Sequence, residues 1–176
     1  MKENKKNTKN TIVIVLDIVL LIFLVVYAIY SFKTSKAYEI DITSFRVETD
    51  KKKFDFCIDS ISKYTLGTKR YISIDGWIVE KGVDSKTLDT IKVVLKDIET
   101  GKYYAIPTTR KTRKDVTKLI YDGVMYDDSG FEVKTQFESI VNPDLHEYEI
   151  FFYMNNEEGK KIIKTDIKVN EWINNH

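Results

Sequence analysis

Hydrophobic and polar residues change their spacing along the chain near position 37. Residues 11–30 read TIVIVLDIVLLIFLVVYAIY, an apolar run interrupted only by Asp17. From Tyr38 onward, short runs rich in Ile, Val, Tyr, Phe and Thr alternate with turn residues, which is typical of β-strands. The pattern therefore predicts one long apolar helix followed by an all-β domain.

The apolar run predicts a single transmembrane helix over residues 11–32. A helix of about 20 residues, rising about 1.5 Å per residue, spans the roughly 30 Å hydrocarbon core of a bilayer. The insertion preference of the aliphatic residues outweighs the roughly 2.5 to 3.5 kcal/mol that Asp17 would cost at the bilayer centre. Asp17 lies about two turns inside the helix, so we interpret it either as an acid near the headgroups or as a contact to a membrane partner.

More lysines precede the apolar run than follow it, which predicts the orientation of the chain. We expect residues 1–10 to form a cytoplasmic basic tail and the domain after the helix to lie outside the cell. A cleaved signal peptide is the alternative, since Ser35 and Ala37 have the small-residue spacing of a cleavage site. The apolar run exceeds a signal core of about 7 to 15 residues, which favours an uncleaved anchor in the plasma membrane. The flanking lysines are Lys2, Lys5, Lys6 and Lys9 before the run, and Lys33 and Lys36 after it.

The remaining chain predicts about seven strands at short spacing and no convincing helix. Two stretches are predicted hairpins, with turns at ETGK, which contains Gly101, and at NNEEGK. Such a pattern favours a two-sheet sandwich over residues 46–170, with a partly open barrel as the alternative. Residues 33–45 are expected to be a linker with a first strand, and residues 171–176 a C-terminal tail. The predicted strand stretches are residues 38–48, 54–62, 71–80, 90–109, 130–140 and 148–169.

Composition and charge narrow the function classes. Hydrophobic residues make up 43% and charged residues 31% of the 176 residues, as in a folded chain rather than a disordered one. The net charge of +1 includes the N-terminal lysines, and the part after residue 37 carries about −3, which argues against a nucleic-acid partner. Cys57 is the single cysteine, so no internal disulfide framework is expected.

The residues that could carry out catalysis form no recognised motif. His146 opens a predicted strand and His176 ends the chain, and neither accompanies a G-x-S-x-G or H-E-x-x-H motif. The DDSG stretch at 127–130 lacks the alternating acids of a calcium loop, so we interpret it as a turn. The sequence predicts no enzyme, no metal site and no cofactor. If the chain were an enzyme, His146, Asp115, Asp127 and Asp128 would be the candidate groups.

The stretch TTRKTRKDVTKLIYDG, residues 108–123, fits neither a strand nor a long amphipathic helix and has two interpretations. In the structural one, Arg113 pairs with Asp115 and pins the connection over the end of the sandwich. Val116, Leu119 and Ile120 would then lie on the core side of one helical turn.

In the functional interpretation, the same stretch belongs to a recognition surface. Aromatic side chains offer flat faces to sugar rings, and arginine binds acidic groups. The candidate ligand-binding residues are Trp77, Tyr103, Tyr104, Arg110, Arg113, Tyr121 and Tyr126.

Several motifs resemble, in their order, an Ig-like β-sandwich module of bacterial envelope proteins. They are GW at 76–77, Y-x-I-P-T-x-R at 104–110, RKDVTKLIYDG at 113–123, YDDSGF at 126–131 and YEIFFY at 148–153. That module occurs behind a single membrane helix or appended to glycosyltransferases and acyltransferases of surface-polysaccharide pathways. Lys114 stands where the familiar form has proline. The positions that match its structural motif are Arg113, Asp115, Val116, Gly130 and Phe131.

The resemblance implies an antiparallel Ig-like fold and a non-catalytic accessory role near envelope glycans. We therefore expect a membrane-anchored, extracytoplasmic sandwich that binds or scaffolds envelope components. Its expected partners are the lipid bilayer and either envelope polysaccharide or a membrane glycosyltransferase or acyltransferase. The alternative is a regulatory subunit that recruits a polytopic membrane enzyme through Asp17 and the helix.

Overall fold

The computed structural model describes residues 14–27, 36–50, 52–136, 141–156 and 159–176. The chain divides into two compact units, Met1–Ser35 and Lys36–His176. The predicted basic tail over residues 1–10 lies outside the described residues, as do residues 28–35 that follow the helical segment.

The prediction of a transmembrane helix over residues 11–32 is wrong for the part of the chain that the structure describes. Among those residues, no helix combines the length and the apolar character needed to cross a membrane. The described helical segment of the first unit covers residues 14–27. Asp17 is an exposed residue of this segment, and its contact with a partner stays a prediction.

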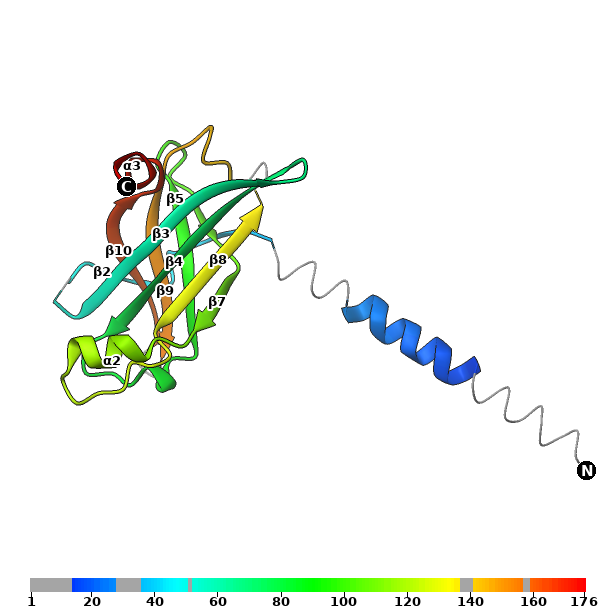
Figure 1. The fold of residues 1–176 in the computed structure, drawn as a ribbon, viewed down its shortest axis with the longest axis horizontal. Coiled ribbons are helices and arrows are strands. Elements are labelled where there is room, and N and C mark those ends of the chain that lie inside the picture. Colours follow the sequence, from blue (N-terminus) through cyan, green and yellow to red (C-terminus); the bar gives the residue numbers. More distant parts are fainter. Residues whose placement is uncertain (1–13, 28–35, 51, 137–140, 157–158) are drawn as a thin grey trace, which may run out of the picture. The chain divides into compact units, whose positions relative to one another are not determined.

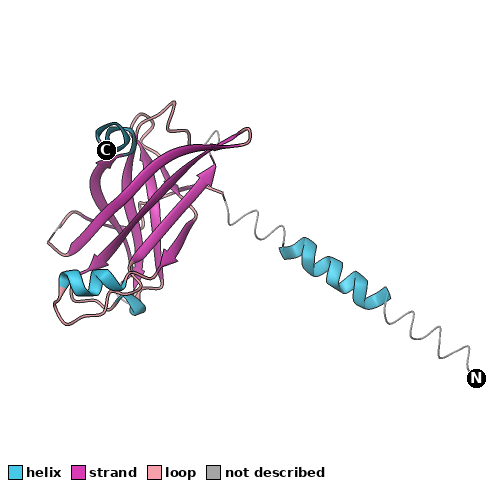
Figure 2. Ribbon diagram, viewed as in Figure 1, coloured by secondary structure: helices cyan, strands magenta, loops and turns pink. Residues whose placement is uncertain are grey.

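The second unit is a β-rich sandwich of two sheets (Figures 1 and 2). The six-stranded sheet has the order β1-β6-β5-β9-β10-β2, and the four-stranded sheet has the order β3-β4-β8-β7. The described strands are β1 (Tyr38–Ile40), β2 (Arg46–Glu48), β3 (Phe54–Leu66), β4 (Lys69–Glu80), β5 (Thr90–Asp97), β6 (Tyr103–Ala105), β7 (Thr108–Lys111), β8 (Gly130–Gln136), β9 (Tyr148–Asn156) and β10 (Gly159–Lys168). The helical elements of this unit are η1 (Ser85–Thr87), α2 (Lys114–Ile120) and α3 (Val169–Asn175).

The sandwich differs from the predicted antiparallel arrangement of about seven strands in two respects. The described residues contain ten strands, because the short strands β1, β2 and β7 occur at sheet edges. In addition, β2 pairs with β10 in parallel, with Val47 opposite Ile162. Short edge strands carry little periodic signal in a sequence, so they are difficult to count before the fold is known.

The predicted hairpin over residues 90–109 is present only in part. β5 and β6 pair antiparallel, and Gly101 in their turn takes a φ of 73°, a value that glycine adopts without steric cost. The chain then leaves the six-stranded sheet at Ile106 and Pro107, and Thr108 begins β7 in the other sheet. Proline provides no N–H for a sheet ladder, so the change of sheet occurs where the ladder would be interrupted.

The main core lies between the inner faces of the two sheets. Ile72, Ile74 and Ile78 project inward from β4 and are fully buried. From the opposite sheet, Phe152 packs against Phe131 with their ring centroids 5.0 Å apart. The burial of these side chains is the main favourable term for the association of the two sheets.

A β-bulge in β3 changes which side chains enter this core. The pairing of β3 with β4 shifts between Ile58 and Ser60, so that Ile58 and Ile61 are both buried although they are three residues apart. A Cβ atom at Gly76, opposite Ile58, would lie 2.1 Å from the Cys57 carbonyl oxygen. The close approach of the two strands at this point therefore requires glycine.

The end of the chain is a helix rather than an extended tail. In α3, Val169 is buried, and Trp172 and Ile173 pack against the main core. Figure 1 shows α3 and α2 at opposite ends of the sandwich. Residues 171–176, predicted as a tail, thus contribute to the packing of one end.

A buried ion pair links the two sheets. Lys161 Nζ of β10 donates to Glu80 Oε1 and Oε2 of β4 at 2.7 and 2.9 Å, and Asn156 Nδ2 of β9 donates to Glu80 Oε2 at 3.0 Å. Lys161 is 2% exposed and Glu80 6%, so both charges lie away from bulk water. Desolvated charges of this kind are tolerated because each is paired.

The Glu80→Gln substitution is expected to lower the free energy of unfolding by about 3 to 5 kcal/mol, since it removes the charge of the carboxylate that the buried Lys161 ammonium contacts at 2.7 and 2.9 Å. Urea denaturation measures the loss. The matched control is Glu39→Gln, which removes an exposed carboxylate paired with Lys102 and should leave the free energy of unfolding nearly unchanged. Equal losses in the two variants would contradict a special role for the buried pair.

Candidate functional site

One chain segment crosses the outer face of the six-stranded sheet. The crossover segment, residues 38–45, connects β1 at one edge of this sheet to β2 at the opposite edge. Asp41 turns the chain after β1, because its Oδ1 accepts the Thr43 N–H at 2.9 Å. A bond from the Phe45 N–H to the Ile42 carbonyl at 3.0 Å completes the turn. These bonds hold the segment in its path over the sheet.

Apolar side chains on the outer face of the sheet hold the crossover segment. Alternation along the strands turns one set of residues away from the main core, namely Val94, Ala105, Phe151 and Ile162. Ile40, Ile42 and Phe45 of the crossover segment pack against this outer cluster. Because the sheet is apolar on both faces, the segment removes from water a surface that would otherwise be exposed.

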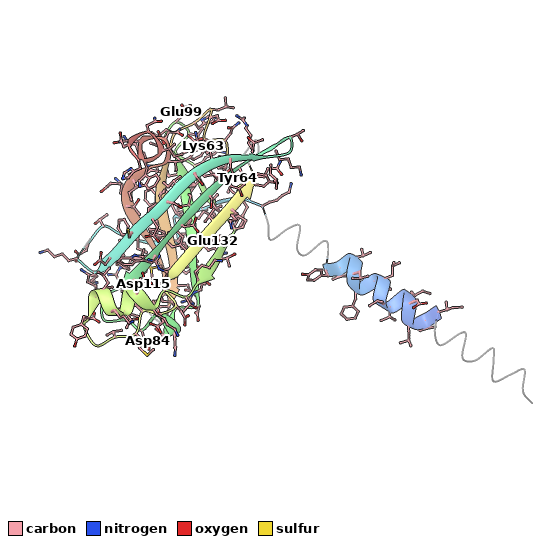
Figure 3. All side chains as sticks on the ribbon, viewed as in Figure 1. Lys63, Tyr64, Asp84, Glu99, Asp115 and Glu132 are labelled. Carbon is pink, nitrogen blue, oxygen red and sulfur yellow. The ribbon has the colours of Figure 1, made fainter. Side chains whose placement is uncertain are left out.

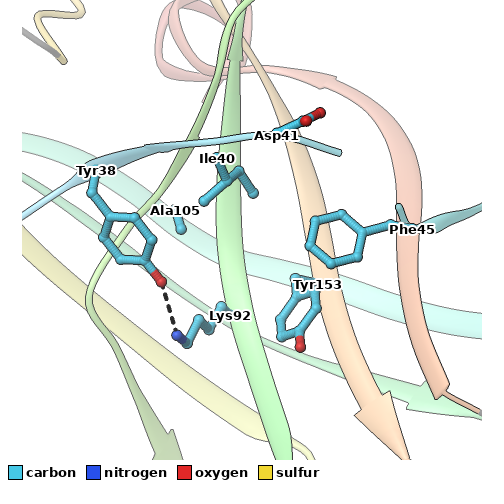
Figure 4. Close-up of a pocket in the computed structure, with 7 residues that line it drawn as sticks. All are labelled: Tyr38, Ile40, Asp41, Phe45, Lys92, Ala105 and Tyr153. Carbon is cyan, nitrogen blue, oxygen red and sulfur yellow. Dashed lines mark hydrogen bonds between the residues drawn. The ribbon is translucent and has the colours of Figure 1, made fainter. Parts of the chain in front are cut away.

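A pocket of about 300 Å³ opens beside the crossover segment (Figure 4). We call it the first pocket. Figure 4 shows the Tyr38 side chain on one side of it and the Phe45 and Tyr153 rings on the other. Its lining residues are Tyr38, Ile40, Asp41, Phe45, Lys92, Ala105 and Tyr153.

Three aromatic rings and one ammonium determine the character of the first pocket. The rings of Phe45 and Tyr153 are tilted by 59° with centroids 5.4 Å apart. Lys92 Nζ lies 3.1 Å from the Tyr38 hydroxyl, beyond the edge of the ring, and 5.7 Å from the ring centroid. The Tyr153 hydroxyl can donate a hydrogen bond at neutral pH, as tyrosine ordinarily does, and burial raises its pKa further. The pocket therefore combines flat apolar faces with polar tips.

The carboxylate of Asp41 adds an acceptor to the rim. Its pKa is held below the ordinary value by hydrogen bonds from the backbone and the side chain of Thr43. Asp41 is thus ionised at neutral pH. The first pocket can consequently offer hydrogen-bond acceptors and donors to one ligand.

The residues predicted as a recognition surface do not lie together. Trp77, Tyr104 and Tyr126 are buried, with at most 7% of each residue exposed. Tyr121 is 89% exposed and ends α2, whereas Tyr103 is half-buried on the outer face of the six-stranded sheet. Of the seven candidate residues, Tyr103 alone lies on the face that the crossover segment covers.

Arg110 binds the backbone of its own domain. Its guanidinium donates to the carbonyl oxygens of Leu88 at 2.7 Å, Ser85 at 2.8 Å and Asp128 at 2.6 Å. These three carbonyls belong to two different loops, so one side chain from β7 fixes both. In this arrangement the donors that would meet an acidic ligand are already engaged.

Arg113 and Asp115 form the ion pair that the sequence suggested. Arg113 Nη2 lies 2.7 Å from Asp115 Oδ2, and Arg113 Nη1 pairs with Asp59 of β3. The hydrogen bond to Asp115 is the main cause that raises the pKa of Arg113, and the same bond lowers the pKa of Asp115. A Cβ atom at Gly130 would lie 2.5 Å from Arg113 Cγ, so glycine is needed for Arg113 to take this position.

The α2 segment packs differently from the predicted helical turn. Val116 is fully buried with Trp77, Val79 and Tyr126, but Leu119 is 71% exposed, so its predicted place on the core side is wrong. The helix ends at Tyr121, which takes a left-handed φ of 49°. With only seven residues in α2, Val116 and the partly buried Ile120 suffice to attach it to the sheet.

The candidate catalytic groups are dispersed. Figure 3 shows Asp115 and Glu99 at opposite ends of the sandwich, and His146 Nδ1 lies 3.3 Å from Glu99 Oε2. Asp127 Oδ1 accepts a hydrogen bond from the Thr117 hydroxyl at 2.6 Å, near α2. Across the described ranges, no group of three or more His, Cys, Asp or Glu side chains is arranged to hold a metal ion.

None of the residues that line the first pocket was a candidate ligand-binding residue in the sequence. Lys92 and Tyr153 lie opposite each other in neighbouring strands, but this register is known only once β5 and β9 are paired. Phe45 lies in a stretch that was predicted only as a weak strand or linker. A signal was nevertheless present, since Tyr38, Ile40, Ile42 and Phe45 give this stretch an apolar content that a solvated linker does not need.

Comparisons with protein-family models, with curated protein sequences and with solved structures find no match to this chain. The resemblance to an Ig-like envelope module therefore stays a prediction.

The free energy of unfolding is expected to depend on the ionisation of Tyr126 at high pH. Burial, together with a hydrogen bond of 2.6 Å to Asp122 Oδ2, raises the pKa of Tyr126 to about 12. An unfolded tyrosine titrates near pH 10, so the stabilisation is complete below about pH 10 and is lost as the pH rises towards 12. Urea denaturation should show a smaller loss over this range in Tyr126→Phe than in the parent chain. Tyr121→Phe, which changes an exposed tyrosine, serves as control. A loss of stability in Tyr126→Phe equal to that of the parent chain would contradict the assignment of the pH dependence to Tyr126.

Proposed function

We propose that the sandwich is a non-catalytic carbohydrate-binding module that takes a glycan of the cell envelope in the first pocket. The observation that carries this proposal is the arrangement of Tyr38, Phe45 and Tyr153 around the Lys92 ammonium. Sugar rings have apolar C–H faces and polar edges, and a site for them needs both kinds of contact.

The lining matches that requirement in detail. Aromatic faces contribute area at a low cost in conformational entropy, while tyrosine hydroxyls act as donors and acceptors. Lys92 can donate to ring or hydroxyl oxygens, and Asp41 can accept from sugar hydroxyls. Ligand pockets usually have volumes of about 300 to 1,000 Å³, so a pocket of about 300 Å³ suits a single sugar unit.

The charges of the lining support binding rather than hydrolysis. Glycosidases ordinarily place two carboxyl groups on either side of the bond that they cleave. The first pocket is lined by one carboxylate, that of Asp41, together with the cation of Lys92. A role in holding a glycan, or in scaffolding the machinery that makes it, is therefore the proposed one.

The envelope is proposed as the source of the glycan because the motif order resembles that of envelope modules linked to surface-polysaccharide pathways. An extracellular position of the domain belongs to this proposal. The alternative role as a regulatory subunit of a polytopic enzyme depends on a membrane helix and stays a prediction.

Amide NMR titration of the full chain with fragments of peptidoglycan, teichoic acid and capsular polysaccharide tests the ligand. We expect saturable shifts at Tyr38, Phe45, Lys92 and Tyr153 with one of these glycans. Tyr153→Ala should weaken binding at least about tenfold, because ring stacking and one hydrogen bond are lost together. Tyr121→Ala, which removes an exposed ring outside the first pocket, should leave the affinity unchanged. If none of the three glycans shifts these signals, the proposal fails.

Labelling of Cys57 tests the proposed location. Cys57 is exposed and is the single cysteine, so a membrane-impermeant maleimide should label the full chain in intact cells that express it. Burial and the nearby Asp59 raise the pKa of the Cys57 thiol. Because maleimide reacts with the thiolate, the labelling rate should continue to increase at pH values above the ordinary pKa of cysteine. Cys57→Ala gives the background. Labelling that requires permeabilised cells would contradict an extracellular domain.

A further inference from the structure

A second pocket lies on the same face of the sheet and shares two residues with the first. It has a volume of about 540 Å³ and is lined by Glu39, Ile40, Asp41, Ile42, Gly101, Lys102 and Tyr103. Ile40 and Asp41 line both pockets. The two pockets are therefore adjacent, with these two residues of the crossover segment between them.

The strand register gives the spacing of the two pockets along the sheet. Lys92 of the first pocket lies on β5 opposite Tyr153, and Lys96 of β5 lies opposite Tyr103 of the second pocket. Lys92 and Lys96 are four residues apart, which is about 13 Å at roughly 3.3 Å per residue. A single sugar ring does not reach over this distance, whereas a short linear chain does.

The second pocket repeats the chemistry of the first. Beside this pocket, although not among its lining residues, Lys96 Nζ lies 5.7 Å from the centroid of the Tyr103 ring, the distance that also separates Lys92 Nζ from the centroid of the Tyr38 ring. Tyr103 also packs edge-on against Phe151, with ring centroids 5.4 Å apart, which fixes the orientation of its ring. Each pocket thus has an aromatic ring with a lysine beside it.

The lysines that line the two pockets, Lys92 and Lys102, differ in how their charges are compensated. Lys102 of the second pocket pairs with Glu39 at 3.0 Å. Lys92 contacts the Tyr38 hydroxyl and ring, and within the described residues it forms no ion pair. The Asp41 carboxylate accepts the Thr43 N–H, and Figure 4 shows it turned away from Lys92. The first pocket therefore presents one ammonium that is not neutralised by a carboxylate.

We infer that the two pockets form one extended site for a linear acidic oligosaccharide that crosses the chain at Ile40 and Asp41. One sugar unit lies against Tyr153 and Phe45 with its acidic group at Lys92, and a later unit lies against Tyr103. This inference rests on the proposed function, because it specifies the length and the charge of the glycan that the first pocket takes.

Calorimetric titration of the full chain with two matched ladders tests the inference. One ladder consists of oligogalacturonic acids of one to six units, and the other consists of the same oligomers with their carboxyl groups reduced to alcohols. We expect affinity for the acidic ladder to rise at least about tenfold between the monomer and the tetramer and then to level off. The reduced tetramer should bind about tenfold more weakly than the acidic one, because a charge-assisted hydrogen bond is lost.

Two variants separate length from charge. Lys92→Gln should remove most of the difference between the acidic and the reduced tetramer, and Lys69→Gln, in the β3–β4 hairpin of the other sheet, should leave that difference unchanged. Tyr103→Ala should lower the affinity for the tetramer while leaving the affinity for the monomer within about twofold. An unchanged dispersed amide spectrum establishes that each variant is folded.

The possible failures are distinguishable. If the envelope glycans shift Tyr38 and Tyr153 but the acidic ladder shows no dependence on length, or none on charge, the extended acidic site is overturned and the carbohydrate-binding function stands. If Tyr103→Ala weakens the monomer and the tetramer equally, the second pocket is not a separate subsite. If neither the envelope glycans nor either ladder binds, both proposals fail.

Discussion

The association of the two sheets through their apolar inner faces is the constraint on which the other features depend. Ile72, Ile74 and Ile78 of one sheet pack against the face of the other sheet that contains Phe152. The buried Glu80–Lys161 pair links the two sheets through β4 and β10. Packing of a sheet on one face leaves its other face to be covered. In the four-stranded sheet α2 covers Trp77 and Val79, and in the six-stranded sheet the crossover segment packs on the outer cluster. The two pockets exist because a single extended segment is narrower than the face on which it lies.

Two regions of the sandwich use polar side chains for different tasks. Near α2, Arg110 and Arg113 bind carbonyls and carboxylates of the same domain, so the conspicuous charges of residues 108–123 stabilise loops. On the outer face of the six-stranded sheet, Lys92 contacts the Tyr38 hydroxyl and has no carboxylate partner among the described residues. The arginine donors near α2 are consequently engaged within the domain, whereas the Lys92 ammonium lines the first pocket.

Much of the strand pattern could be predicted from the sequence, and the reasons for the failures are physical. Gly101 in its turn and the long alternating runs of β4, β5, β9 and β10 follow local rules, so the sequence alone was sufficient. Trp77 and Tyr126 were expected on a recognition surface but are buried, because burial on the outer face of β4 is decided by α2, which lies far along the chain. Leu119 was expected on the core side but is exposed, because Val116 and Ile120 already occupy the contact between α2 and the sheet. The transmembrane prediction came from the apolar run of residues 11–30, whereas no helix among the described residues is long and apolar enough to cross a membrane. Of the pocket residues, only Tyr103 was anticipated, because Lys92 and Tyr153 come together through a register that no local pattern specifies.

The parallel pairing of β2 with β10 has a consequence for the order in which the molecule is made. Residues 46–48 form their ladder with residues 161–163, which leave the ribosome more than a hundred residues later. Contacts of such large sequence separation form slowly. Because the chain is synthesised from its N-terminus, β2 can pair only after β10 has left the ribosome. The crossover segment can be anchored at both of its ends only after β10 has been synthesised, so both pockets are completed among the last parts of the domain. A nascent or C-terminally truncated chain would then expose the outer cluster to water, which makes this face the place where a chaperone would meet an incomplete molecule.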